Sequence, residues 1–116
     1  MKRQAAQAQG RQAEVIAAAF LCRKDWTNLG ERVRTPAGEV GLGVRRPGLF
    51  AFVEVMVPRD PTTLALSLDR QRLARVAAAA ESLIPRYAEP GDDIRIDAVM
   101  IAPGRLPVHL EHVWQG

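Results

Sequence analysis

Cysteine and aromatic residues are scarce in this 116-residue chain. It has one cysteine, Cys22, so no intramolecular disulfide can form, and this favours a reducing, cytoplasmic setting. Aromatic residues make up 5% of the sequence. So few aromatic rings argue against the stacking platforms on which many proteins bind single-stranded nucleic acid.

Long hydrophobic runs are also absent. No stretch of 18 or more apolar residues occurs, and the amino-terminal segment is polar rather than apolar. We therefore expect no transmembrane helix, no signal peptide and no membrane partner. The length fits one domain over residues 10–116, preceded by a polar, glutamine- and alanine-rich lead-in over residues 1–9.

Lysine is rare, and arginine carries almost all of the positive charge. The formal net charge is +3 and the isoelectric point is about 9.7, which permits nucleic-acid binding without establishing it. Arginines cluster in three places, namely Arg32 with Arg34, Arg45 with Arg46, and Arg70 with Arg72 and Arg75. Such guanidinium groups can follow a line of phosphates, or they can form an ordinary solvated surface.

Hydrophobic periodicity predicts two helices and five strands. Apolar residues recur at helical spacing over residues 11–24, and again from a cap at Ser67 or Asp69 to residue 84. Strand-like segments cover residues 28–34, 39–44, 49–57, 94–102 and 108–114, separated by proline and glycine turns. Short connections make the first three strands an antiparallel meander, and the second helix allows a parallel crossover to the fourth. These features predict an α/β fold with a mixed central sheet.

Two of the predicted strands each carry an acidic residue, and in each the residue two positions later is uncharged. Residues two apart on a strand share a face, so Glu39 faces the same way as Gly41, and Glu54 the same way as Met56. Carboxylates on neighbouring strands are how many hydrolytic enzymes hold Mg²⁺ or Mn²⁺ over a phosphodiester. On these faces position 41 is a glycine and position 56 is a methionine.

These segments resemble the YraN-type uncharacterised proteins, which are bacterial relatives of restriction endonucleases. That family's pattern is Gly-Glu-Ile-Asp followed by Phe-Val-Glu-Val-Lys, and this chain has Gly38-Glu39-Val40-Gly41 and Phe52-Val53-Glu54-Val55-Met56. Further matches are Glu14 in the opening helix, the pair Arg70-Gln71, and Arg95-Ile96-Asp97-Ala98. The resemblance implies a restriction-endonuclease-like, three-layer fold, with element order α-β-β-β-α-β-β and helices flanking the sheet.

The resemblance also implies site residues, and two of them are lost. The family's metal-binding Asp is Gly41 here, and its catalytic Lys is Met56. Glu54, Glu39 and Glu14 remain as a remnant catalytic set, with Glu54 and Glu39 as the candidate metal ligands. Nucleic-acid contacts fall to Arg45, Arg46, Arg70, Gln71 and Arg72. An arginine is a poor substitute for the lysine as a proton carrier, because it stays protonated.

Simpler interpretations compete at several residues. Glu54 lies in a nearly continuous apolar run, so a structural partner such as an arginine explains it without a metal. Asp97 and Arg95 share a strand face and predict an ion pair. His109 and His112 would face opposite sides of a strand, which argues against a zinc site.

The leading interpretation is a catalytically impaired nuclease-fold protein that binds DNA or RNA through phosphates. No cofactor is expected, and Mg²⁺ or Mn²⁺ enters only with residual activity. One alternative is a weak or altered Mg²⁺/Mn²⁺-dependent endonuclease in which Glu39 or Glu14 replaces the lost ligand. A second alternative is a protein-interaction module on the same scaffold. The sequence leaves the oligomeric state open.

Overall fold

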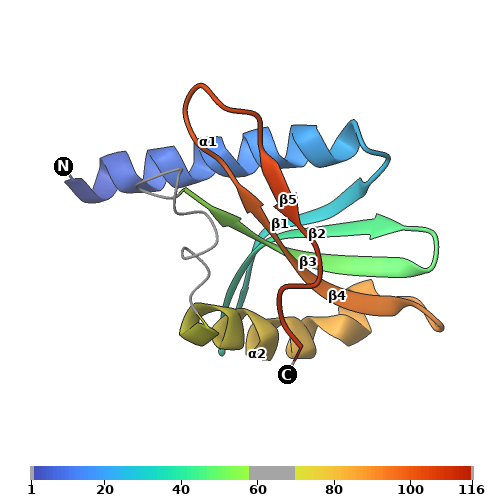
Figure 1. The fold of residues 1–116 in the computed structure, drawn as a ribbon. Coiled ribbons are helices and arrows are strands. Elements are labelled where there is room, and N and C mark those ends of the chain that lie inside the picture. Colours follow the sequence, from blue (N-terminus) through green and yellow to red (C-terminus); the bar gives the residue numbers. More distant parts are fainter. Residues whose placement is uncertain (1, 58–69, 116) are drawn as a thin grey trace.

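The computed structural model describes the backbone of residues 2–57 and 70–115, and side chains from residue 10 onward. The described residues form two helices and five strands in the order α-β-β-β-α-β-β (Figure 1). Their bounds are α1 Lys2–Cys22, β1 Thr27–Thr35, β2 Gly38–Arg46, β3 Leu49–Met56, α2 Arg70–Tyr87, β4 Asp93–Met100 and β5 Val108–Leu110. Neither helix of this part of the chain has the length and apolar composition that a membrane crossing requires.

The five strands form one mixed sheet in the order β1-β2-β3-β4-β5. The first three strands are antiparallel neighbours, β3 and β4 are parallel, and β5 returns antiparallel to β4. The predicted meander, the parallel crossover and the α/β class with a mixed sheet are therefore confirmed. Gly48, with φ of +75°, closes the tight turn between β2 and β3, a conformation that glycine adopts without a steric penalty.

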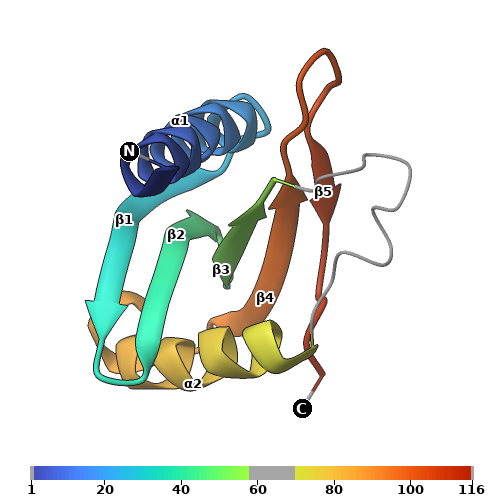
Figure 2. The same ribbon diagram turned by 90° about the vertical axis from the view of Figure 1, so that its left-hand side faces the viewer.

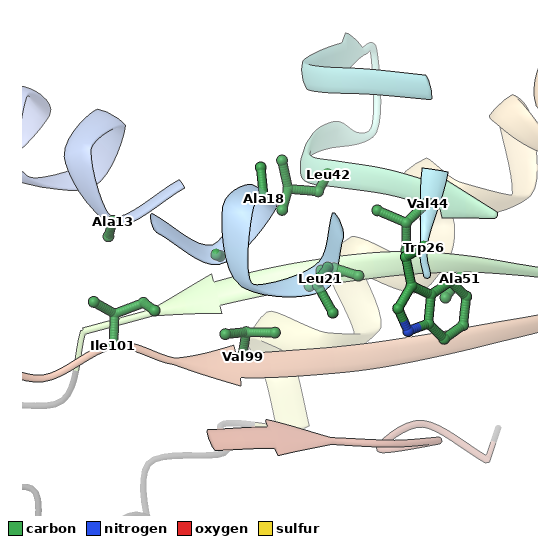
Figure 3. Packing of buried hydrophobic residues seen from close by; sticks show 11 residues of the cluster. Ala13, Ala18, Leu21, Trp26, Leu42, Val44, Ala51, Val99 and Ile101 are labelled. Carbon is green, nitrogen blue, oxygen red and sulfur yellow. The ribbon is translucent and has the colours of Figure 1, made fainter. Parts of the chain in front are cut away.

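The helices cover opposite faces of the sheet, which gives three layers (Figure 2). Alternation along β3 supplies both interfaces. Ala51 and Val53 pack beneath α1, whereas Phe50 and Phe52 pack beneath α2. Figure 3 shows the α1 interface, where Leu21 and Trp26 lie over Val99 and Val44.

At its amino-terminal end the first helix includes the polar lead-in, which the sequence allows to be helical. It begins at Lys2, so the lead-in over residues 2–9 continues the helix, as its glutamine and alanine content allows. At the other end, the predicted limit of residue 24 gives way to Cys22. Backbone N–H groups of Trp26 and Asp25 donate to the carbonyls of Leu21 and Cys22, and Asp25 has φ of +67°. This is a Schellman cap, completed by contact between Trp26 and Leu21 in the core.

The second helix passes through Pro85, where the sequence predicted an end at residue 84. Pro85 cannot donate to a carbonyl one turn earlier, yet the helix continues to Tyr87. The carbonyl of Ile84 accepts a hydrogen bond from the N–H of Ala88 at 2.9 Å. The Tyr87 ring lies 5.8 Å from that of Phe50, so this last turn gains packing that offsets the lost bond. The predicted caps, Ser67 and Asp69, lie outside the described residues.

The last strand is shorter than predicted, because it ends at Leu110 rather than at residue 114. His112 has φ of +53°, which breaks the extended conformation. The N–H of Val113 still donates to the carbonyl of Ile96 at 2.8 Å. The segment after β5 therefore turns towards α2, where Val113 and Trp114 pack against the core.

Candidate functional site

A cavity of about 290 Å³ brings together acidic residues from three elements. Glu14 comes from α1, Glu39 from β2 and Glu54 from β3, and Gly41 lines the same cavity. Two arginines complete the charged lining, Arg32 from β1 and Arg72 from the first turn of α2. This cavity is the carboxylate pocket.

The backbone is irregular where β1 and β2 border the pocket. Pairing runs from Glu31–Leu42 to Val33–Val40, and Arg32 and Gly41 lie between these pairs. Arg32 has φ of +49°, a left-handed conformation that costs about 1–3 kcal/mol for a residue with a side chain. This conformation accompanies an Arg32 side chain that reaches Glu14 on α1.

Glu54 is held by an arginine. Nε of Arg72 donates to Oε1 of Glu54 at 2.6 Å, and a second guanidinium nitrogen forms an ion pair with the same oxygen. The Glu54 side chain is 10% exposed, whereas that of Arg72 is 43% exposed. The carboxylate therefore lies at the buried end of a pair whose guanidinium opens to solvent.

Glu14 is held in the same manner by the other arginine. Nε of Arg32 donates to Oε1 of Glu14 at 2.9 Å. The second oxygen of this carboxylate, Oε2, is buried and lacks a hydrogen-bond partner among the described residues. Glu39 is more exposed and pairs with Arg34 at 3.5 Å, on the outer side of the pocket.

Burial raises the pKa of two of these carboxylates, Glu14 and Glu54. Desolvation raises the pKa of Glu54 above the usual value, and the nearby Arg72 opposes part of that increase. Desolvation likewise raises the pKa of Glu14 against the opposing effect of Arg32. Repulsion from Glu39 adds to both increases. The carboxylates therefore share one electrostatic environment, as functional sites and structural ion-pair networks both do.

Met56 lies outside the lining of this pocket. It follows Glu54 by two residues on β3, and its side chain is 5% exposed in a cluster with Ala98 and Met100. The position that resembles the family's lysine is thus a core position here. Gly41 differs, because it does line the pocket beside Glu54.

The residues of the pocket do not fit a divalent cation. Position 41 offers no side-chain oxygen, and the carboxylates at 14 and 54 each already face a guanidinium group. No group of three or more His, Cys, Asp or Glu side chains over residues 10–57 and 70–115 is arranged to hold a metal ion. Hard cations need several oxygen ligands, whereas Glu14 and Glu54 as described here form an ion-pair network with two arginines.

The predicted nucleic-acid contacts separate into two groups. Arg70, Gln71 and Arg72 begin α2 and lie at the pocket end of the molecule, with the Arg70 guanidinium 4.9 Å from the centre of the Trp114 ring. Arg45 and Arg46 lie at the far end of β2, beside the turn to β3. The structure does not bring these two groups together.

Arg45 and Arg46 both make contacts within the protein. Arg45 forms ion pairs with Asp92 and Glu89, and its hydrogen bond lowers the pKa of Asp92. Arg46 donates to the carbonyl of Lys24 and lies 4.3 Å from the centre of the Trp26 ring. These contacts tie the turn between β2 and β3 to its neighbours.

A second polar network surrounds Asp97, which is fully buried. Arg95 donates to both carboxylate oxygens at 3.0 and 2.8 Å, which confirms the predicted ion pair. Nε2 of His109 lies 2.8 Å from Oδ2, and the backbone N–H of His112 donates to Oδ1 at 2.9 Å. The contact between His109 and Asp97 was not predicted from the sequence. Pairing the two last strands about their turn would have placed His109 beside Asp97.

This second network is structural. Burial raises the pKa of Asp97, but hydrogen bonds from His109, Arg95 and His112 outweigh burial and hold that pKa below its usual value. The carboxylate is therefore ionised and fully bonded. It fastens β5 and the following segment to β4.

Comparison with known proteins gives one consistent result. The family described as "Uncharacterised protein family UPF0102" matches residues 13–101. A UPF0102 protein of Sphingopyxis alaskensis is 53% identical over 115 residues, covering 99% of each chain. UPF0102 proteins of Rhizorhabdus wittichii and Erythrobacter litoralis are 49% and 46% identical over 115 residues. The alignments cover 99% of this chain in both cases, and 98% and 99% of these two relatives.

Proposed function

Because the chain belongs to the UPF0102 family, which is the YraN family that its sequence resembles, we propose that it is a restriction-endonuclease-like protein without metal-dependent cleavage that binds nucleic acid through phosphate contacts. The three-layer arrangement around a mixed sheet supports the fold part of this proposal. The carboxylate pocket supports the functional part.

One observation carries the proposed loss of cleavage. The Glu54 carboxylate, which would be a metal ligand in an intact relative, is bonded to Arg72, while Gly41 beside it has no side chain. The guanidinium supplies the positive charge that buried Glu54 requires. Arg72 therefore stabilises the carboxylate where an active relative would use a cation.

The arginine side chains around the pocket are the feature that supports phosphate binding. Arg75 acts electrostatically on Glu54, and Arg34 pairs with Glu39. Together with Arg32 and Arg72, these make four arginines beside the four glutamates Glu14, Glu31, Glu39 and Glu54. A guanidinium group has five donors, so an arginine that is bonded to a carboxylate can also donate to a phosphate oxygen.

The direct test combines metal titration with nucleic-acid retention. Calorimetric titration with Mn²⁺ should show no saturable binding at millimolar metal. Filter retention of duplex and branched DNA should weaken as salt increases, with a log–log slope of about −0.9 for each phosphate contact. The control for both measurements is Arg23→Ala, an exposed residue outside the pocket lining.

Two results would contradict the proposal. Saturable Mn²⁺ binding that is lost in Glu54→Ala would support a slow metal-dependent endonuclease instead. One observation favours that second candidate, namely the buried Oε2 of Glu14 without a partner among the described residues. Absence of DNA and RNA retention at low salt would instead support a module that binds proteins.

A further inference from the structure

The beginning of β4 has no neighbouring strand on its outer side. β5 pairs with β4 only from Ala98 to Met100, and the segment after β5 is bonded to β4 at Ile96, whose carbonyl accepts the N–H of Val113 at 2.8 Å. In Figure 1 the beginning of β4 extends past this carboxyl-terminal segment, towards the turn between β2 and β3. In the described part of the chain, no strand therefore pairs with the outer side of Ile94, and this stretch is the open edge of β4.

The backbone of Ile94 presents a donor and an acceptor at the open edge. The carbonyl of Ile96 points away from β3, because it bonds to Val113. Backbone groups of residues two apart on a strand point to the same side, so the N–H and the C=O of Ile94 also point outward. An antiparallel strand placed beside β4 would exchange both N–H···O bonds with this residue.

Two cavities flank the open edge, one on each face of the sheet. The α2-side cavity has a volume of about 440 Å³ and is lined by Ala78 and Ile84 of α2. The turn-side cavity has a volume of about 520 Å³ and is lined by Leu49, which packs on the α1 side of the sheet. Ile94 and Arg95 line both cavities, so the open edge lies between them. Side chains of an added strand alternate between the two faces, so successive residues would enter the two cavities in turn.

The charged groups at the open edge are mainly acidic. Asp93 lines the turn-side cavity and Glu81 lines the α2-side cavity, and neither forms an ion pair with another described residue. Arg95 lines both cavities, but its guanidinium is bonded to both oxygens of Asp97 and lies 3.6 Å from Glu111. The open edge therefore attracts a positively charged partner and repels the phosphates of nucleic acid.

We propose that the open edge of β4 binds an extended, basic segment of another protein as an added strand. A residue opposite Ile94 shares its face, so an apolar side chain there enters the α2-side cavity, which has alanine and isoleucine walls. The next residue points to the other face, where a lysine or arginine meets Asp93. Backbone bonds supply affinity and the two side chains supply specificity, as in other complexes formed by strand addition.

Charge and strand geometry distinguish this occupant from the alternatives. A second copy paired through the same edge would bring another Asp93 and another Glu81 to a site where these carboxylates have no ion-pair partner among the described residues. The opposite edge of the sheet, at β1, is protected. There the N–H of Gly30 is bonded to the side chain of Asn28 at 3.2 Å, and the φ of +49° at Arg32 interrupts the extended strand. Strand addition is therefore favoured at β4 rather than at β1.

The test measures fluorescence anisotropy of a dye-labelled peptide, Thr-Lys-Val-Lys-Thr with blocked ends. The natural protein should bind it, and should bind the acidic counterpart Thr-Glu-Val-Glu-Thr roughly tenfold more weakly. Methyl groups on the three central peptide nitrogens remove the backbone donors and should also weaken binding roughly tenfold. In the complex, the amide proton of Ile94 should exchange more slowly with solvent than in the free protein.

Matched variants locate the binding on the protein. Asp93→Lys should reverse the preference, weakening the basic peptide roughly tenfold and strengthening the acidic one. Glu31→Lys makes the same charge change on β1 and should leave both affinities within about twofold. Ala78→Phe adds a ring at the α2-side cavity and should weaken binding, whereas Ala19→Phe, an equally exposed change on α1, should not. Urea unfolding of all four variants checks that they fold.

Several outcomes would overturn the inference. No binding of the basic peptide, equal affinity for the two peptides, or no effect of N-methylation would mean that the edge does not take up a basic strand. Equal effects of Asp93→Lys and Glu31→Lys would mean that net charge, rather than this edge, matters. Self-association without peptide that Asp93→Lys abolishes, measured by sedimentation, would assign the edge to a second copy. None of these outcomes bears on nucleic-acid binding, because neither cavity shares a lining residue with the carboxylate pocket.

Discussion

Arg72 on α2 and Glu54 on β3 form an ion pair that joins a helix to the sheet through the carboxylate pocket. The arginine comes from the first turn of α2, and the glutamate from the buried end of the central strand. The pair therefore connects the proposed site directly to the stability of the fold.

Removal of the arginine should destabilise the protein. Arg72→Ala leaves the buried Glu54 carboxylate without this partner, which should cost about 1–2 kcal/mol, less than for a fully buried pair because Arg72 is partly exposed. Arg75→Ala, an exposed change one turn later, should cost less than about 0.5 kcal/mol. Urea unfolding at pH 7 measures both, and equal losses would contradict the structural role of the pair.

The effect of Arg72→Ala should depend on pH. The pKa of Glu54 is raised in the folded protein, so its contribution to stability is fully present below the unfolded value near 4.5 and decreases as pH rises. Loss of Arg72 raises this pKa further. The difference in unfolding free energy between the natural protein and Arg72→Ala should thus be small at pH 4 and grow towards pH 7. A difference that is constant over this range would show that Glu54 does not titrate with the pair.

Asp97→Asn should show the opposite dependence. The pKa of Asp97 is lowered in the folded protein, so its stabilisation is present above the unfolded value near 3.8 and is lost as pH falls through the folded value. The substitution should cost about 2–4 kcal/mol at pH 7 and progressively less in acid. Asp93→Asn, an exposed change at the start of β4, is the control. Denaturant unfolding at pH 3 and pH 7 measures both, and an equal cost for Asp97→Asn at the two values would refute the prediction.

Gly41→Asp should give the pocket a measurable affinity for Mn²⁺. It restores an oxygen ligand beside Glu54, although a Cβ at this position would lie 3.1 Å from the carbonyl oxygen of Val53. A contact this tight requires a small backbone shift, so a loss of stability of about 1 kcal/mol should accompany the gain. Calorimetry with Mn²⁺ detects the binding, and Gly41→Asn controls for the added volume. If both variants bind equally, or neither binds, the position is not a ligand site.

Met56→Lys should destabilise the protein rather than restore catalysis by itself. The side chain at 56 is buried against Ala98 and Met100, so an ammonium group there would lose its hydration, at a cost of about 2–4 kcal/mol. Met56→Leu keeps the volume and should cost less than about 1.5 kcal/mol. Thermal unfolding distinguishes them. Metal-dependent cleavage by the double variant Gly41→Asp/Met56→Lys, at unchanged stability, would show that position 56 can reach the pocket.

The sequence was sufficient to predict the α/β class and the course of the sheet. Alternation in β3 and the prolines and glycines at the turns are local signals, and they determine which strands become neighbours. The convergence of Glu39 and Glu54 on one cavity follows from the meander in the same way. The boundaries that were wrong, at Cys22, Tyr87 and Leu110, depend on positive φ angles at Asp25 and His112 and on packing of the Tyr87 ring, which no local pattern encodes.

The pairing of carboxylates with arginines could not be predicted from the sequence. Which arginine meets Glu54 depends on how α2 is rotated and positioned over the sheet, and no local pattern encodes that. Arg32, which bonds Glu14, has a left-handed backbone that no local pattern in β1 indicates. The expectation that Glu54 has an arginine partner was correct, whereas the identity of that partner needed the tertiary structure.

The hydrogen bond from His112 to Asp97 has a practical consequence for proteolysis and for the design of shortened variants. Residues after Leu110 fasten to a carboxylate on one face of the sheet and then carry Trp114 to the helix on the other. Cleavage after residue 111 would remove the His112 N–H that bonds Asp97. It would also expose the part of the α2 core cluster that Val113 and Trp114 cover. Trimming a few carboxy-terminal residues would thus act like a substitution in the hydrophobic core.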